Sequence, residues 1–120
     1  EKQRVFIAQV IAQQSSIIIL DEPTSHLDIG HSFKILDIIR EINRSGITVI
    51  AVLHDLNLAS EYCTGLLMLK KGEVFAKGTV EDVITYKNIE DAYDTKVLVY
   101  KNPHTGKPYV FGIPAGLLTG

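Results

Sequence analysis

Two short runs of apolar, mostly β-branched residues constrain the fold of this chain more than any other feature. The runs cover residues 17–20 and 47–53, and ionisable residues follow each of them at once. Continuous apolar runs of this length are typical of strands that are buried on both faces. A stretch with helical spacing separates the two runs. The order strand, helix, strand predicts an α/β fold with a parallel sheet.

The stretch between the two runs carries the signals that begin and end a helix. Asp28 is a favourable N-cap residue, and Gly46 follows the last apolar position, where a left-handed backbone is common. We therefore expect a helix that begins after Asp28 and ends at about Arg44. Another helix, largely buried, is predicted over 2–14. The inward positions predicted for the helix after Asp28 are Phe33, Leu36, Ile39 and Ile42.

Shorter elements are predicted in the second half of the chain. One hairpin is expected over 66–77, and another over 96–114 with a turn rich in proline and glycine. Between them, Thr79 and Asp82 have the spacing of a capping box that begins a short helix. Asn88 is expected to cap the next short helix.

Composition limits the class of protein. Hydrophobic residues make up 46% of the 120 residues and charged residues 22%, which are the proportions of one globular domain with a core. The net charge of −2 and the pI of about 6.1 give no basic surface of the kind that nucleic-acid binding requires. Cys63 is the single cysteine, so an internal disulfide is excluded and a small buried or half-buried thiol is the simplest interpretation.

Adjacent carboxylates follow the first apolar run. The side chains of Asp21 and Glu22 should leave the strand on opposite sides, so they can serve different tasks. One can hold Mg²⁺, usually through water, and the other can orient or deprotonate an attacking water. For an apolar run followed only by Asp-Glu, a pair that caps the next turn remains the simpler alternative.

His54 follows the second apolar run. The carboxyl ends of parallel strands meet at one edge of a sheet, so His54 is expected to lie at the same edge as Asp21 and Glu22. A histidine at such a position is often structural. A neutral imidazole also offers one donor and one acceptor, which allows it to sense a phosphate oxygen on one side and to orient another group on the other.

The ten residues ILDEPTSHLD, 19–28, resemble the Walker B segment and the D-loop of ATP-binding cassette (ABC) ATPases. The resemblance implies that Asp21 is the carboxylate on the Mg²⁺ side, acting through water, and that Glu22 is the general base. It further implies that Ser25 and Asp28 belong to the D-loop, which crosses to a partner subunit and couples two ATP sites.

Two further segments resemble the same family. The residues TVIAVLHDLNLA, 48–59, are similar to its switch strand and H-loop, which implies that His54 contacts the γ-phosphate and bridges to the catalytic glutamate. The residues EKQRVFIAQVIAQQ, 1–14, are similar to the stretch that directly follows the LSGG signature loop.

The last third of the chain resembles one subfamily of these ATPases. The segments NIEDAYDTKVLVY and PHTGKPYVFGIP, together with the hairpin before them, are similar to the ATPases of importers for iron–siderophore, haem and cobalamin. The implied fold is the C-terminal half of a P-loop NTPase (RecA-like) ABC nucleotide-binding domain, with a parallel sheet core, C-terminal hairpins and short helices. Residues 1–78 would be the Walker B, D-loop and H-loop part of the core, and residues 79–120 the C-terminal helices and hairpin.

The resemblance implies an ATP hydrolase coupled to transport, with ATP and Mg²⁺ as cofactors. The implied partners are a second nucleotide-binding domain in a head-to-tail dimer, membrane permease subunits and, indirectly, a periplasmic or lipoprotein substrate-binding protein, with no nucleic acid. The implied location is the cytoplasmic face of the cell membrane.

Three motifs of the family do not occur in these 120 residues: the Walker A loop, the Q-loop and the LSGG glycines. Gly106-Lys107 is no Walker A remnant, because Pro108 follows it in a predicted turn. The isolated chain is therefore expected to be inactive. The family's Walker A strand would lie between 47–53 and 66–69. We expect the gap to be closed by direct pairing of these strands, by another copy or by a separate piece of the parent chain.

Other interpretations remain open at this point. One is a soluble ABC ATPase that acts in DNA repair or translation, and another is a non-catalytic fragment with a structural or binding role. A transition-metal site formed by His26, His31 and His104 is not favoured, because His26 and His31 are five residues apart across the boundary between a loop and a helix.

Overall fold

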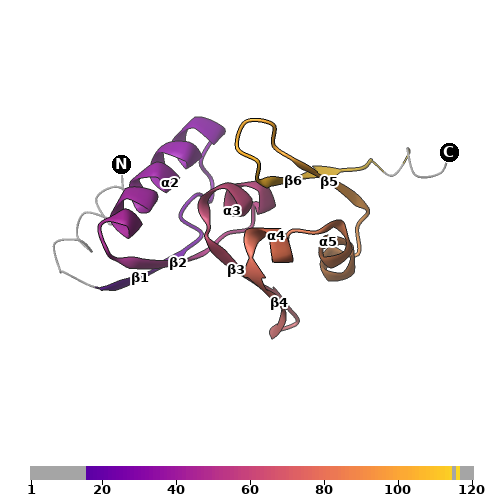
Figure 1. Ribbon diagram of the computed structural model, residues 1–120, viewed down its shortest axis with the longest axis horizontal. Helices are drawn as coiled ribbons and strands as arrows, with labels where there is room; N and C mark the ends of the chain where they lie inside the picture. Colours follow the sequence, from indigo (N-terminus) through magenta and orange to yellow (C-terminus); the bar gives the residue numbers. More distant parts are fainter. Residues whose placement is uncertain (1–15, 115, 117–120) are drawn as a thin grey trace. The chain divides into compact units, whose positions relative to one another are not determined.

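The computed structural model describes residues 16–114 and residue 116 (Figure 1). The helix predicted over 2–14 lies outside the described residues. The chain divides into two compact units, Glu1–His54 and Asp55–Gly120. The division at residue 78 that the family resemblance implies stays a prediction.

The first unit has the predicted order of strand, helix and strand. Strand β1 covers Ile17–Asp21, helix α2 covers Ile29–Arg44, and strand β2 covers Thr48–Val52. The two strands pair in parallel, with Ile17 opposite Thr48 and Asp21 opposite Val52. The predicted α/β fold with a parallel pair of strands is therefore confirmed.

Only one face of this two-stranded sheet is covered in the described part of the chain. Ile18 and Leu20 are each 4% exposed, whereas their neighbours Ile17 and Ile19 are 57% and 69% exposed. Ile50 lies opposite Ile19 in the register and is also exposed. The prediction that both strands are buried on both faces is thus wrong for the described residues. The described part of this unit supplies one helix, and one helix covers one face of a sheet.

Helix α2 begins and ends close to the predicted residues. Asp28 is its N-cap, and Gly46 follows the end of the helix with a φ of 110°, a conformation that favours glycine. Phe33 is 39% exposed, so its predicted inward position is wrong. It lies well off the stripe that Leu36 and its buried neighbours form along the helix. The buried residues of α2 are Ser32, Ile35, Leu36, Ile39 and Ile42.

The described part of the second unit contains two antiparallel hairpins and three α-helices. Its helices are α3 (Leu56–Tyr62), α4 (Val80–Val83) and α5 (Tyr86–Tyr93). Its strands are β3 (Gly65–Lys70), β4 (Glu73–Thr79), β5 (Val97–Lys101) and β6 (Pro108–Gly112). Strand β3 pairs with β4 and β5 pairs with β6, so both predicted hairpins are confirmed.

Strand β2 belongs to the first unit and is hydrogen-bonded to β1, and β3 belongs to the second unit and is hydrogen-bonded to β4. The three expected ways to close the gap between β2 and β3, which are direct pairing, another copy and a separate piece of the parent chain, stay predictions.

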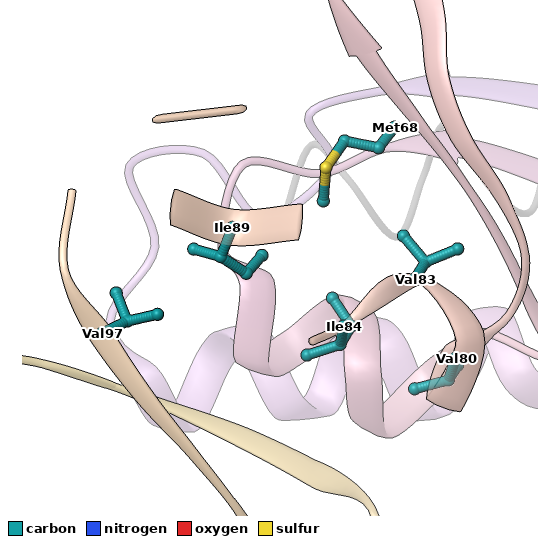
Figure 2. Close-up of a cluster of buried hydrophobic side chains, with 6 residues drawn as sticks. All are labelled: Met68, Val80, Val83, Ile84, Ile89 and Val97. Carbon is teal, nitrogen blue, oxygen red and sulfur yellow. The ribbon is translucent and has the colours of Figure 1, made fainter. Parts of the chain in front are cut away.

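The core of the second unit explains how such short helices are held in place. Six side chains from β3, α4, α5, β5 and the residue after α4 form one buried cluster (Figure 2). A helix as short as α4 is not stable through helix propensity alone, so tertiary burial has to hold it. The members of the cluster are Met68, Val80, Val83, Ile84, Ile89 and Val97.

One predicted helix cap is confirmed and another is wrong. The Thr79 hydroxyl accepts from the Asp82 N–H at 3.2 Å, and Asp82 accepts in return from the Thr79 N–H at 3.1 Å, which is a capping box. The cap of α5 is Thr85 and not Asn88, whose backbone N–H donates to the Thr85 hydroxyl. The Asn88 side chain instead donates to the carbonyl of Val83 at the end of α4.

Polar contacts tie α3 to the second hairpin. The Asn57 side chain accepts from the Val110 N–H at 2.7 Å and donates to the Val110 carbonyl at 3.1 Å, as a neighbouring strand would. Ser60 is fully buried, and its hydroxyl donates to the carbonyl of Pro108. Cys63 follows α3 and is half-buried, and burial raises the pKa of its thiol, which favours the unreactive protonated form.

Replacing Val83 by alanine should destabilise the second unit by about 2 kcal/mol, because the side chain is 1% exposed and its loss leaves a cavity. The matched control is Val74→Ala in the same unit, where the valine is 56% exposed and the expected cost is below about 1 kcal/mol. Urea unfolding of both variants measures the difference. Equal costs for the two variants would contradict the core described above.

Candidate functional site

The carboxyl ends of β1 and β2 lie at one edge of the parallel sheet. Asp21 is opposite Val52 in the register. The N–H of Glu22 donates to the Val52 carbonyl at 3.0 Å, so the hydrogen-bonded ladder continues one residue beyond β1. His54 comes two residues after the end of β2. The register of the two strands therefore carries Glu22 and His54 to the same edge, as the sequence predicted.

The side chains of Glu22 and His54 are in contact. Nε2 of His54 contacts Oε1 of Glu22. The side chain of His54 is 77% exposed and that of Glu22 is 38% exposed. When the carboxylate is ionised it can only accept, so Nε2 must carry the proton in this contact. The arrangement leaves the second oxygen of Glu22 and the Nδ1 atom of His54 for other partners.

The backbone of the loop after β1 is unusual for its residue types. Glu22 has a φ of 49° and His26 a φ of 66°, which are left-handed conformations that residues other than glycine seldom adopt. Two tight turns follow one another here, because the Ser25 N–H donates to the Glu22 carbonyl and the Leu27 N–H donates to the Thr24 carbonyl. Left-handed residues of this kind cluster at functional sites, where the surrounding structure holds them.

Asp21 is an exposed residue at the end of β1, directly before Glu22 in the chain. Mg²⁺ prefers oxygen ligands, keeps several waters and takes only one or two protein carboxylates, completing its shell with substrate phosphates. Within the described residues no group of three or more histidine, cysteine, aspartate or glutamate side chains could hold a metal ion. The donor set therefore fits Mg²⁺ bound together with a phosphate ligand, and does not fit a metal held by the protein alone.

Ser25 and Asp28 lie on the loop that follows the carboxylates. Ser25 is half-buried and is joined to Glu22 by the backbone hydrogen bond described above. Asp28 is exposed, and Oδ1 of its side chain accepts from the N–H of His31 at 2.8 Å. The same oxygen lies 2.8 Å from Nδ1 of His31. Asp28 is therefore engaged with the first turn of α2.

The contact of the His31 ring with Asp28 was not predicted from the sequence. The signal that could have revealed it is a histidine three residues after an aspartate N-cap, where the two side chains lie on one side of the helix end. Among the five predicted site residues, the structure places Asp21, Glu22 and His54 at the sheet edge and Ser25 and Asp28 on the adjoining loop. Their chemical roles stay predictions.

No protein-family model matches the chain. Curated proteins do match it along most of its length. The ferric enterobactin transport ATP-binding protein FepC of Escherichia coli is 40% identical over 117 residues, which cover 97% of this chain and 42% of that protein. The hemin import ATP-binding protein HmuV of Aliivibrio fischeri is 44% identical over 115 residues, covering 92% and 44%. The cobalamin import ATP-binding protein BtuD of Halobacterium salinarum is 37% identical over 115 residues, covering 95% and 29%. The chain thus spans less than half the length of these relatives.

Solved structures share its fold. A metal-chelate type ABC transporter in an inward-facing conformation matches with a TM-score of 0.84 over 96% of this chain and 47% of that one, and the identity of 22% shows the fold alone. CbiO1 of Clostridium perfringens, part of an ABC transporter complex, matches with a TM-score of 0.64 and 32% identity over 73% of this chain and 36% of that one. In the part of the chain that the structure describes, no single helix is both long enough and apolar enough to cross a bilayer.

Proposed function

This chain belongs to the family of ABC transporter ATP-binding proteins, and it spans less than half the length of the relatives it matches. We therefore propose that it is the Walker B, D-loop and H-loop part of an ATP-hydrolysing import subunit. The observation that carries the proposal is the contact of Glu22 with His54 at the end of the parallel strands. We further propose that residues 1–78 belong to the catalytic core and residues 79–120 to its C-terminal part.

In this proposal the whole protein hydrolyses ATP to drive import of an iron–siderophore, haem or cobalamin. The names of three relatives support this substrate class, since they refer to ferric enterobactin, hemin and cobalamin. The proposed partners are a second nucleotide-binding domain, a membrane permease and, through the permease, a substrate-binding protein. The proposed location is the cytoplasmic face of the membrane.

The residues at the sheet edge divide the chemistry between them. When bound, Mg²⁺ supplies positive charge that neutralises the phosphoryl group in transfer. Asp21 would hold it through water. Glu22 orients the attacking water and takes its proton, using the oxygen that His54 leaves free. His54 orients Glu22 through Nε2, and an imidazole that carries protons on both nitrogens can at the same time donate from Nδ1 to a phosphate oxygen.

Ser25 and Asp28 serve a second ATP site in this proposal. They lie on the loop that leads from Glu22 into α2, so a movement of that loop would shift both Glu22 and the first turn of α2. We propose that the two residues couple hydrolysis in one subunit to the state of the ATP site in its partner.

A non-transport ABC ATPase is the second candidate function. The archaeal ribosome recycling factor aABCE1 matches with a TM-score of 0.70 over 96% of this chain, at 21% identity, so the fold alone does not separate the two functions. The import proteins are 37–44% identical over 92–97% of this chain, which favours import.

The 120-residue chain alone should not bind Mg-ATP measurably, because its sequence has no loop whose backbone N–H groups could cradle the phosphates. A full-length protein, meaning this chain extended to the length of its relatives, should bind Mg-ATP with micromolar affinity. Titration calorimetry of both proteins provides the comparison. Micromolar binding by the short chain would contradict the prediction. A Lys107→Met control in the full-length protein should bind normally, since Gly106-Lys107 lies in the β5–β6 turn.

A further inference from the structure

We propose that His31 is a positioning residue for Asp28, whose carboxylate it fixes through one oxygen so that the other remains for the coupling of two ATP sites. This inference rests on the proposed function, because it assigns a regulator to the loop that the proposal places between the sites. It concerns a residue to which neither the motifs nor the comparisons give a role.

The geometry shows more than an ordinary helix cap. An aspartate N-cap needs only a backbone N–H as its donor, and Asp28 already has that donor in the N–H of His31 at 2.8 Å. The His31 ring adds a second contact, 2.8 Å from Nδ1 to the same oxygen, Oδ1. Two donors from one residue on one oxygen restrict the rotation of the carboxylate, and both of these contacts are made to Oδ1 and not to Oδ2.

The protonation state of the ring follows from these contacts. The backbone N–H of His31, and after it the side chain, lower the pKa of the Asp28 carboxyl below its ordinary value. An ionised carboxylate only accepts hydrogen bonds, so Nδ1 of His31 must carry a proton. In the neutral ring, Nε2 is then the acceptor, and the tautomer is set by Asp28.

Stability is a poor explanation for the ring contact. The side chains of His31 and Asp28 are 50% and 67% exposed, and exposed ion pairs of this kind contribute little to folding. The N–H of His31 would cap α2 with any side chain at this position. What the ring adds is a fixed orientation for a carboxylate on the loop after Glu22.

The test uses three substitutions in the full-length protein, all of which keep the backbone cap. His31→Leu removes the ring donor. His31→Asn places an amide nitrogen close to the position of Nδ1, and His31→Gln places one closer to the position of Nε2. Positioning through Nδ1 predicts that the Leu and Gln variants lose about three- to fivefold in kcat with an unchanged KM for ATP, and that their Hill coefficient falls toward 1. The Asn variant should keep most of the wild-type kcat and Hill coefficient.

The nitrogen chemical shifts of the His31 ring provide a second readout that does not depend on activity. We expect the Nδ1–H tautomer in the wild-type protein, and its loss on Asp28→Ala. The Nε2–H tautomer in the wild-type protein, or Leu and Gln variants with wild-type kcat and cooperativity, would overturn the inference. A Glu22→Gln variant measured alongside separates the two proposals, because wild-type turnover in that variant overturns the proposed function itself.

Discussion

Replacing Glu22 by glutamine in the full-length protein is expected to lower steady-state ATP hydrolysis by roughly 10²- to 10⁴-fold and to leave ATP binding intact. The amide oxygen of glutamine can still accept from Nε2 of His54, so the geometry of the pair should be kept. The amide cannot take a proton from water, so the step that Glu22 is proposed to assist is lost. Phosphate release measures hydrolysis, and calorimetry measures binding.

A matched control for this substitution is Glu41→Gln. Glu41 is an exposed residue of α2 that pairs with Arg44 at 3.1 Å, so the control removes the same charge at a position away from the sheet edge. Hydrolysis should be unchanged in the control. Wild-type turnover in the Glu22→Gln variant would show that another group activates the water.

His54→Ala is expected to lower kcat by roughly 10²-fold, because the substitution leaves Glu22 without the donor that orients it and removes the proposed contact to phosphate. His54→Gln should recover part of the loss, since its amide nitrogen can reach the position of Nε2. Single-turnover hydrolysis at saturating ATP measures the chemical step in both variants.

His104→Ala is the control for a histidine that serves another purpose. Its backbone N–H donates to the Asn102 side chain at 2.9 Å in the turn between β5 and β6, and the rate should not change when its side chain is removed. If His54→Ala hydrolyses ATP at the wild-type rate, His54 is structural, the alternative that the sequence left open.

The parallel strands and their common edge could be predicted because they depend on local pattern. Two β-branched runs with a capped helix between them allow few topologies, and a parallel register brings the residues after each run together. The exposed faces could not be predicted in the same way. Ile19 and Ile50 have the composition of a doubly covered sheet, but what covers a strand is decided by the rest of the molecule, and the described residues cover one face only.

The two other wrong predictions, the cap of α5 and the inward position of Phe33, have local causes. Thr85 and Asn88 are both good cap residues three positions apart, and the choice between them depends on the carbonyl of Val83, which engages the Asn88 side chain. Phe33 is apolar and follows the buried Ser32 in the chain, but its position around the helix axis is well away from the buried stripe of α2, so it is exposed.

The candidate site likewise has features that could be predicted from the sequence and features that could not. The roles of Asp21, Glu22 and His54 came from resemblance, and the pattern of residues explained only why they should share an edge. The left-handed backbone of Glu22 was not predictable, because glutamate has no preference for that conformation. The contact of the His31 ring with Asp28 depends on the side-chain orientation at the first turn of α2, which spacing permits but does not require.

A double-mutant cycle on Glu22 and His54 in the full-length protein is the most direct test of their action as one catalytic unit. Steady-state ATP hydrolysis would be measured for Glu22→Gln, for His54→Ala and for the double variant, with ATP binding checked in each. Residues that act as a unit give non-additive losses, so the double variant should hydrolyse ATP within about threefold of the slower single variant. A double variant slowed by the product of the two single effects would show that the residues act independently, and would contradict the proposed pair.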